Sequence, residues 1–293
     1  MMSQERSRCL GLLIPSFSNA VFSDVIRAVH QRATESNYNV VIAYIGYDVK
    51  EEEKQIAFLL SYQIDGIILT ESEHSALTIK RLKSANVSVA EIMSYQDNPL
   101  DICVGLNHKT ISYLSTKALI LSGRKNIAYL GARLDKRTML RQEGYLQAMQ
   151  EANLKPLIYD KQQNSTFSLG KDITKEALSF NKNLDGIITT NDDLAVGALL
   201  YLQSIGVKIP EDISILGYNG LNITKAVNPN LCSIKTPLFE MGYLATDLMI
   251  KKLNNEPILK RAVCLDYNLT DGKTLRTSEI EILNKLKVKS LVN

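Results

Sequence analysis

The sequence predicts an α/β protein of two lobes, each built on a parallel sheet with helices on both faces. Two observations support this fold class: short apolar segments alternate with longer amphipathic segments along the 293 residues, and one segment of the first half recurs in the second half. A strand in a parallel sheet covered on both faces is apolar throughout, because neither of its sides meets water. Repeated strand–helix alternation of this kind is typical of Rossmann-like lobes.

The first half of the chain alternates four predicted strands with three predicted helices. The strands are the short apolar segments "CLGLLIP", "NVVIAYI", "DGIILT" and "VSVAEI". The helices between them are "FSDVIRAVHQRATES", "EEEKQIAFLLSY" and "SALTIKRLKSAN". Phe22, Val25, Ile26 and Val29 recur at helical spacing in the first helix. The acidic start of the second helix suits the positive end of a helix dipole.

The second half repeats the alternation. Its predicted strands are "KNIAYLG", "PLIYD", "DGIITT" and "SILGYN", and its helices are "RTMLRQEGYLQAMQEAN", "SLGKDITKEALSF", "DDLAVGALLYLQSIG" and "FEMGYLATDLMIKKLNN". The segment "YQIDGIILTES" at residues 62–72 is echoed by "KNLDGIITTND" at residues 182–192. Alone, the shared Asp-Gly-Ile-Ile is equally explained as a common turn into a strand. With the whole alternation repeated, it indicates two similar lobes.

Composition argues against several classes of function. A formal net charge of +3 is weak evidence for nucleic-acid binding, which usually shows a concentrated basic face. The four cysteines form no CxxC pair and the three histidines lack ligand spacing, so we expect reduced thiols in a cytoplasmic protein and no metal. Neither GxGxxG, GxxxxGKS/T nor GxSxG occurs. We therefore expect a binding protein without a cofactor, not an enzyme.

The N-terminal segment has one feature of a signal peptide, because Arg6 and Arg8 precede the apolar "CLGLLIP". The apolar run is short, Pro15 ends it, and a helical pattern follows without a clear cleavage site. We interpret the segment as a buried first strand. No other run approaches the length of a membrane span, so we expect no membrane association.

Polar and charged residues gather where predicted strands end, in "PSFSNAVF", "TESE", "EIMSY", "GARLDKRT", "TTNDD" and "GYNG". Ligands of open parallel sheets bind beyond these carboxyl ends. After one strand, Arg133, Lys136, Arg137 and Arg141 form a basic cluster. A solvated helix face, a nucleic-acid patch and a pocket for a small anion are the three alternatives. The anion pocket is favoured, since the aromatic and further basic residues of a nucleic-acid patch are missing around the cluster.

Four ordered segments carry a resemblance to a known family: "GLLIPSFSNAVFSDVIRAV", "TNDDLAVGAL", "GVKIPEDISILGYN" and "SIKTPLFEMG". Over roughly residues 7–269 the chain resembles the effector-binding region of the lac-repressor family of bacterial transcription regulators. The resemblance implies the fold of periplasmic sugar-binding proteins, an effector in a cleft between the lobes, and a homodimer. Family members begin with a helix-turn-helix domain that binds operator DNA. This sequence starts at the effector domain, so we expect DNA binding only through a helix-turn-helix domain absent from it.

In this fold the chain crosses between the lobes three times. We place the crossovers near Gly105–His108, Lys235–Leu238 and Asp266–Leu269. The predicted domain boundaries follow: an N-terminal lobe of residues 7–105 plus 238–266, a C-terminal lobe of 108–235 plus 267–277, and a C-terminal tail of 278–293. The tail has the pattern of a short amphipathic helix, which we expect to pack or fray rather than to form a tetramer.

The basic cluster suits a sugar acid. The segments "EIMSYQDNPLDICVG", "YLGARLDKRTMLRQEGY" and "LDGIITTNDDLAVGA" are similar to those of family members that respond to gluconate. By this resemblance Arg141 holds an acceptor atom of the ligand and Arg137 faces the effector. Four residues apart on a helix, they share a face, and two guanidinium forks suit a carboxylate. Arg133 lies nearer the strand end and can reach the same group.

The late strand offers a second argument. Relatives have GYD or GFD there, whereas this chain has "GYNG" with Asn219. An aspartate beside a bound carboxylate would repel it, and asparagine keeps the hydrogen-bonding shape without the charge. By resemblance Asn191 bonds ligand hydroxyls, and Asp192 is expected to cap the following helix. Ser165 stands where many relatives place an aromatic over the sugar ring, and an open-chain acid needs no such platform.

The first lobe supplies further candidates at its strand ends: Ser16, Asn19, Phe22 and Glu71. Phe22 is equally placed for the core, and Glu71 for solvent. We predict the effector-binding and dimerisation domain of a repressor that senses a sugar acid, gluconate or a related aldonate. Two alternatives remain: a regulator of the same family that senses a neutral sugar, and a periplasmic-type sugar receptor for transport, which would need a signal peptide.

Overall fold

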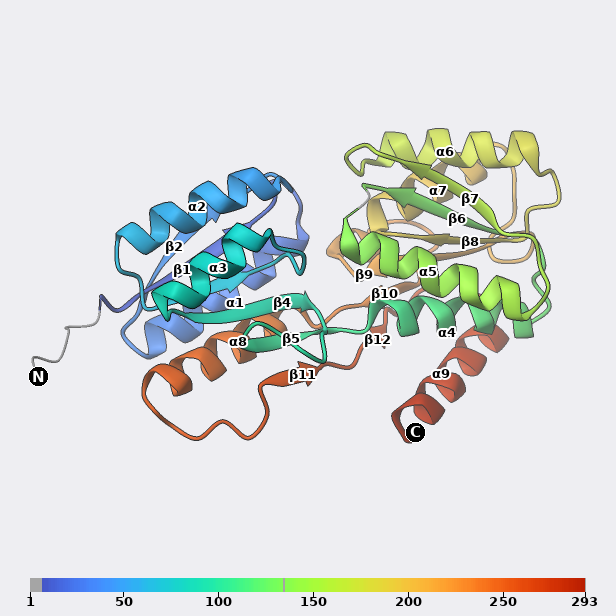
Figure 1. Ribbon diagram of the computed structural model, residues 1–293. Coiled ribbons are helices and arrows are strands. Elements are labelled where there is room, and N and C mark those ends of the chain that lie inside the picture. The colour runs from blue at the N-terminus through green and yellow to red at the C-terminus, as the bar shows by residue number, and fades with distance from the viewer. Residues whose placement is uncertain (1–6, 134, 293) are drawn as a thin grey trace, which may run out of the picture. The chain divides into compact units, whose positions relative to one another are not determined.

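The computed structural model describes residues 7–133 and 135–292, and the chain divides into two compact units (Figure 1). The first unit contains the residues up to Asn107 together with Pro237–Asp266. The second contains His108–Thr236 together with the residues from Tyr267 onward. Each unit is built on a six-stranded sheet. The predicted α/β class with two parallel-dominated sheets is confirmed.

The first unit is a parallel sheet with helices on both faces, in the strand order β11-β5-β4-β3-β1-β2. Helices α1 (Val21–Glu35) and α8 (Leu238–Leu253) pack together, and so do α2 (Val49–Ser61) and α3 (Ala76–Ala85) (Figure 1). Its strands are β1 (Cys9–Ile14), β2 (Asn39–Tyr44), β3 (Gly66–Leu69), β4 (Ser88–Ser94), β5 (Ile102–Leu106) and β11 (Ala262–Cys264).

Successive residues of β3 show why both faces are covered. The missing Cβ of Gly66 leaves room for Met249 of α8, whereas the next side chain, Ile67, belongs to a core with Ile56 and Leu59 of α2. Side chains of a strand point alternately to its two faces. A strand with helices on both sides is therefore buried along its whole length, as β3 is.

The second unit repeats this plan in the strand order β12-β10-β9-β8-β6-β7, with β12 antiparallel to β10. Helices α4 (His108–Leu121) and α5 (Lys136–Glu151) pack together, and so do α6 (Phe167–Phe180) and α7 (Asp192–Ser204). Its strands are β6 (Ile127–Ala132), β7 (Leu157–Lys161), β8 (Gly186–Thr189), β9 (Ser214–Asn219), β10 (Ser233–Lys235) and β12 (Asn268–Leu269). A short 3-10 helix, η1 (Asn222–Lys225), follows β9.

The sequence echo marks equivalent places in the two sheets. Strand β3 lies between β4 and β1, and β8 lies between β9 and β6. These are the strands of the two repeated segments, and four further strands of each sheet occupy matching positions in the same chain order. The interpretation of the echo as two similar lobes therefore fits the observed topology.

The last helix, α9 (Thr277–Val292), is anchored on the second unit, although the sequence pattern set it apart as a tail. It packs on α4. Its first turn buries Glu279, which accepts hydrogen bonds from Arg124 Nε at 2.9 Å and from Ser214 Oγ at 2.7 Å. Leu283 is also buried. Both a charged and an apolar contact therefore fix this helix.

Among residues 7–133 and 135–292, no helix combines the length and apolar composition that a membrane span requires. Nor do their histidine, cysteine, aspartate and glutamate side chains form a group of three or more that could hold a metal ion.

Candidate functional site

The second unit brings together five of the predicted effector residues. Arg133 follows β6, Asn191 follows β8 by two residues, and Asn219 ends β9. Strands β6, β8 and β9 are neighbours, so their carboxyl ends meet at one edge of the sheet. Arg137 and Arg141 lie on α5, which begins at that edge. This is the edge where open parallel sheets bind ligands.

Asp135 sets the start of α5 and therefore the position of its arginines. Its carboxylate accepts a hydrogen bond from the backbone N–H of Thr138 at 2.9 Å, as an N-cap does. Arg137 Nη2 lies 3.7 Å from Asp135 Oδ2. Burial acts to raise the pKa of Asp135, but Arg137, the Thr138 N–H and then Arg141 and Arg133 hold it below its ordinary value. This carboxylate is thus ionised among three guanidinium groups.

Arg141 is buried and held by three partners. Its guanidinium carbon lies 3.7 Å from the centre of the Tyr218 ring, Nη1 donates to the carbonyl of Thr190, and Nε and Nη2 each lie 3.5 Å from His108 Nδ1. Nδ1 must accept, because a guanidinium only donates, so the Tyr218 hydroxyl 2.8 Å away donates to it as well. Burial raises the pKa of Tyr218 to about 12, although Arg141 acts against that rise.

Asn191, not Asp192, caps α7. Asn191 Oδ1 accepts from the backbone N–H of Leu194 at 3.2 Å and from Ser165 Oγ at 2.7 Å. The expectation that Asp192 forms the cap is therefore wrong, because Asp192 lies inside the first turn of α7. With Oδ1 occupied, the Nδ2 donor is the atom of Asn191 suited to a ligand acceptor.

Asp192 has a different role that the sequence did not reveal. Its side chain is fully buried, and its oxygens accept from Ser233 Oγ at 2.5 Å and from the backbone N–H of Leu221 at 2.7 Å. Burial raises its pKa to about 7, while the bonds from Ser233 and Leu221 act to lower it. Asp192 thereby ties the turn after Asn219 to the start of α7.

The backbone at Asn219 restricts which residues fit there. Asn219 has a φ of +108° and is 8% exposed, and Gly220 follows with a φ of +68°. Asparagine and aspartate both tolerate positive φ better than other non-glycine residues. The backbone therefore explains why one of the two occurs, but it does not explain the choice of the uncharged one.

The remaining predicted residues belong to the first unit, after β1 and β3. Ser16 Oγ accepts from the Asn19 N–H at 3.1 Å, and Asn19 Oδ1 accepts from the Val21 N–H at 3.1 Å, so both shape the turn into α1. Phe22 is 2% exposed, in agreement with the core alternative. Glu71 is half-buried. The role of these four residues in effector binding stays a prediction.

The first unit also contains a buried ionic cluster that the sequence analysis missed. His74 Nδ1 lies 2.9 Å from Glu52 Oε1, and His74 Nε2 lies 3.4 Å from Glu91 Oε1. Burial acts to lower the pKa of His74, but the two carboxylates outweigh it and raise the pKa to about 9. Glu91 also accepts from the Leu100 N–H at 2.7 Å. The sequence feature that could have revealed this cluster is Glu91, a glutamate inside the apolar segment "VSVAEI".

Comparison with known proteins places the chain in a family. A protein-family model described as a periplasmic binding protein-like domain matches residues 116–275 of the sequence. The regulator GntR of Escherichia coli K12 is 36% identical over 94% of this chain and 83% of its own length, and IdnR of the same strain is 39% identical over the same shares. The chain belongs to the lac-repressor (LacI) family of transcription regulators.

Solved structures agree with the LacI-family assignment. GntR of Chromobacterium violaceum has a TM-score of 0.87 and 28% identity, covering 91% of this chain and 98% of that one. A LacI-family regulator of Silicibacter pomeroyi has a TM-score of 0.90 and 26% identity, covering 94% and 84%. The predicted family is thus confirmed, and the chain is the effector-binding domain of a transcription regulator, not an enzyme.

Proposed function

We propose that this LacI-family domain senses a sugar acid, gluconate or a closely related aldonate, through the arginines of its second unit. The observation that carries the proposal is the burial of Arg137 and Arg141 one helical turn apart, at 5% and 7% exposure, beside Asn191 and Asn219. Buried cations are costly unless negative charge balances them. A ligand carboxylate would supply that charge.

The local charge balance supports an anionic ligand. The acids whose pKa responds to these arginines are Asp135, beside Arg137 and Arg141, and Asp193, beside Arg133. The arginines thus act to lower the pKa of both carboxylates. Arg141 carries two N–H groups on each of Nη1 and Nη2, which bond Thr190 and His108 respectively. Two such N–H groups form the fork that a carboxylate accepts.

The polar groups around the arginines suit a polyol chain. Asn191 offers its Nδ2, and Asn219 adds an amide without negative charge. Ser165 is engaged by Asn191 and supplies no aromatic surface. An aldonate in its open form has a carboxylate at one end and hydroxyls along the rest, so it matches an arginine pair followed by amides.

We further propose a homodimer that binds operator DNA through a helix-turn-helix domain outside this sequence and works in the cytoplasm. The first unit exposes Phe17, stacked on Tyr44 with ring centroids 5.6 Å apart, and Ile42, which is on the same face of β2 as Tyr44. These residues lie on or next to β2, the edge strand of the sheet. Exposed apolar groups of this kind mark protein interfaces. The effector would change DNA affinity by its different affinity for two states of the dimer.

The test is calorimetric titration of the chain with gluconate, with glucose, ribose and a purine as comparison ligands. We expect selective gluconate binding that Arg137→Ala and Arg141→Ala weaken by roughly a hundredfold, since each removes a charge-assisted fork worth about 2–3 kcal/mol. Arg27→Ala removes an exposed arginine of α1 that contacts Asp24 and the Phe239 ring in the first unit, so it is the matched control and should bind as the wild type does.

A neutral sugar is the competing ligand class, and one observation favours it. Asp135 lies 3.7 Å from Arg137 and already offsets part of the positive charge. Binding of glucose or ribose with gluconate inert would support this alternative. It would leave the family unchanged and reject the proposed role of the arginines and Asn219.

A further inference from the structure

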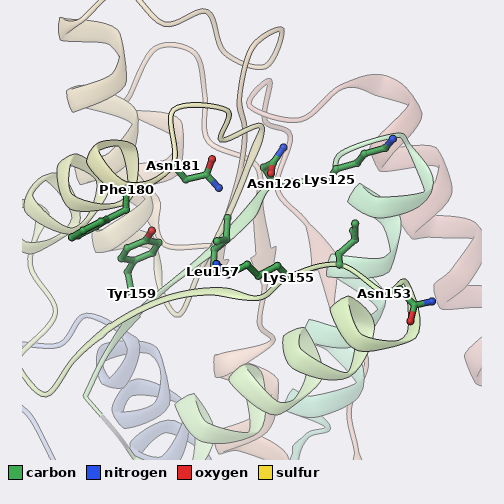
Figure 2. Close-up of a pocket in the computed structure, with 9 residues that line it drawn as sticks. Lys125, Asn126, Asn153, Lys155, Leu157, Tyr159, Phe180 and Asn181 are labelled. Carbon is green, nitrogen blue, oxygen red and sulfur yellow. The ribbon is translucent and has the colours of Figure 1, made fainter.

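A hollow of about 550 Å³ opens in the second unit at the end of the sheet opposite the arginines (Figure 2). It lies where β6 and β7 begin, between the loop that precedes β6, the loop that precedes β7 and the end of α6. Its volume falls within the range of about 300–1,000 Å³ that small-molecule sites occupy. None of the predicted effector residues lines it.

One end of the hollow is aromatic. Phe180, the last residue of α6, is 77% exposed, and Tyr159 of β7 lies beside it in Figure 2. A phenylalanine exposed to this degree gains little from the core. Flat side chains at the mouth of a hollow are instead suited to stacking on a planar ring, and stacking on an aromatic residue contributes about 1–3 kcal/mol per base.

The remainder of the hollow is cationic. Lys125 and Lys155 line it, no aspartate or glutamate does, and neither lysine has an ion pair with the residues that the structure describes. The Asp185 carboxylate is not among the lining groups, but it accepts from the backbone N–H groups of Lys125 and Asn126 at 2.9 Å each and so adds negative charge beside them. Helices α4, α5 and α6 all end at this edge of the sheet, so the two lysines also act against the partial negative charge of up to about half a charge at each helix end.

Amide groups lie between the two ends. Figure 2 shows Asn126 and Asn181 between the Phe180–Tyr159 pair and Lys125. An asparagine side chain both donates and accepts, so it can read the edge of a heterocycle or bond a sugar hydroxyl. In the same view Lys155 lies beside Leu157, near the middle of the hollow, so the amides separate the aromatic pair from Lys125.

We propose that this hollow is a second ligand site, for a mononucleotide. Its heterocycle would stack on Phe180 and Tyr159, its sugar and base edge would meet the asparagines, and its phosphate would lie at Lys125 and Lys155. Strands β6 and β7 begin at the hollow and run to Arg133 and Lys161 at the other edge. The nucleotide site and the proposed aldonate site thus lie at opposite ends of the same strands and share no residue.

The test is calorimetric titration of the full chain with adenosine 5′-monophosphate, and separately with adenosine and with inorganic phosphate. We expect the nucleotide to bind at least about tenfold more tightly than either part, because ring and phosphate contacts add. Phe180→Ala and Lys155→Gln should each weaken nucleotide binding about tenfold. Phe167→Ala is the matched control: Phe167 begins the same helix, is 46% exposed and lies outside the hollow.

Two further variants separate this site from the arginine site. Arg141→Ala should leave nucleotide binding unchanged, and Phe180→Ala should leave gluconate binding unchanged. Circular dichroism of each variant is the control that tests whether it is folded. Equal affinities for the nucleotide and for phosphate, or normal nucleotide binding by Phe180→Ala, would overturn the proposal. So would nucleotide binding that Arg141→Ala abolishes, because the nucleotide would then occupy the arginine site. Failure of gluconate to bind would leave this result intact.

Discussion

Arg141 is fixed in position by the protein before any ligand binds. Its guanidinium stacks on Tyr218 and donates to the carbonyl of Thr190, and His108 accepts from its edge. A long side chain normally loses rotamer freedom on binding, at a cost of about 0.5–1.5 kcal/mol. That cost is already met in the folded protein. The proposed contribution of Arg141 to effector binding therefore depends on Tyr218, Thr190 and His108, which hold its guanidinium in place.

The charge argument at Asn219 gives a prediction for its replacement by aspartate, which exchanges the amide NH2 for a carboxylate oxygen. Asn219→Asp should weaken gluconate binding by roughly thirtyfold, because a carboxylate a few ångströms from the bound one costs about 2 kcal/mol at a partly screened site. The backbone tolerates the change, since aspartate accepts positive φ as asparagine does. Titration calorimetry of the variant with gluconate and with glucose measures the effect, and glucose affinity should not fall.

Asn181→Asp provides the control for that experiment. It adds the same charge to the same unit, at the opposite edge of the sheet, and Asp can still accept from the Asn183 N–H as Asn181 does. Its gluconate affinity should match the wild type. Equal losses in the two variants would mean that overall charge, and not the neighbourhood of the ligand, determines affinity.

At the scale of elements, the sequence predicted most strands and helices whose buried sides are apolar, although β5, which is apolar and buried throughout, was not recognised. Helix α4 was missed because hydroxyls interrupt its buried face: Ser112, Ser115 and Thr116 are buried, and the last two bond to carbonyls one turn earlier. Strands β10, β11 and β12 were not recognised as strands because three or two residues are too few to show a period.

The candidate site was predictable only in part, for a related reason. Arg137, Arg141, Asn191 and Asn219 stand at strand ends or on the helix that follows, and the resemblance to the family selected them from the residues there. Tyr218 and Asp192 are parts of apolar segments, and their roles depend on contacts with residues far away along the chain. Pairings between distant segments cannot be read from a local period.

The buried contacts of Glu279 help to fix helix α9 to the second unit, which gives a prediction for this element. Glu279→Ala should lower the free energy of unfolding of the second unit by about 3 kcal/mol, because it leaves the buried Arg124 without its carboxylate. Chemical denaturation followed by circular dichroism measures the change. Glu281→Ala, on the exposed side of the same helix, should change the free energy by less than about 0.5 kcal/mol. Equal effects would contradict the assigned role of the buried pair.

At the scale of the whole molecule, each unit contains a buried group whose pKa is raised. The two groups titrate in different pH ranges. In the first unit the pKa of His74 is raised from 6.5 to about 9 by Glu52 and Glu91, against the effect of burial. In the second unit burial raises the pKa of Asp192 from 3.8 to about 7. A raised pKa means that the folded unit binds the proton more tightly, so each unit loses stability as pH rises through its own range.

The two units should therefore respond separately to pH. From His74, the first unit should lose up to about 3 kcal/mol between pH 6.5 and 9, and from Asp192 the second should lose up to about 4 kcal/mol between pH 4 and 7. Denaturation of wild type, His74→Gln and Asp192→Asn at a series of pH values, with hydrogen exchange to assign each transition to a unit, measures both slopes. Each variant should flatten only its own slope relative to wild type, whatever its absolute stability. A slope that persists in His74→Gln between pH 6.5 and 9 would show that another group in the first unit binds the proton.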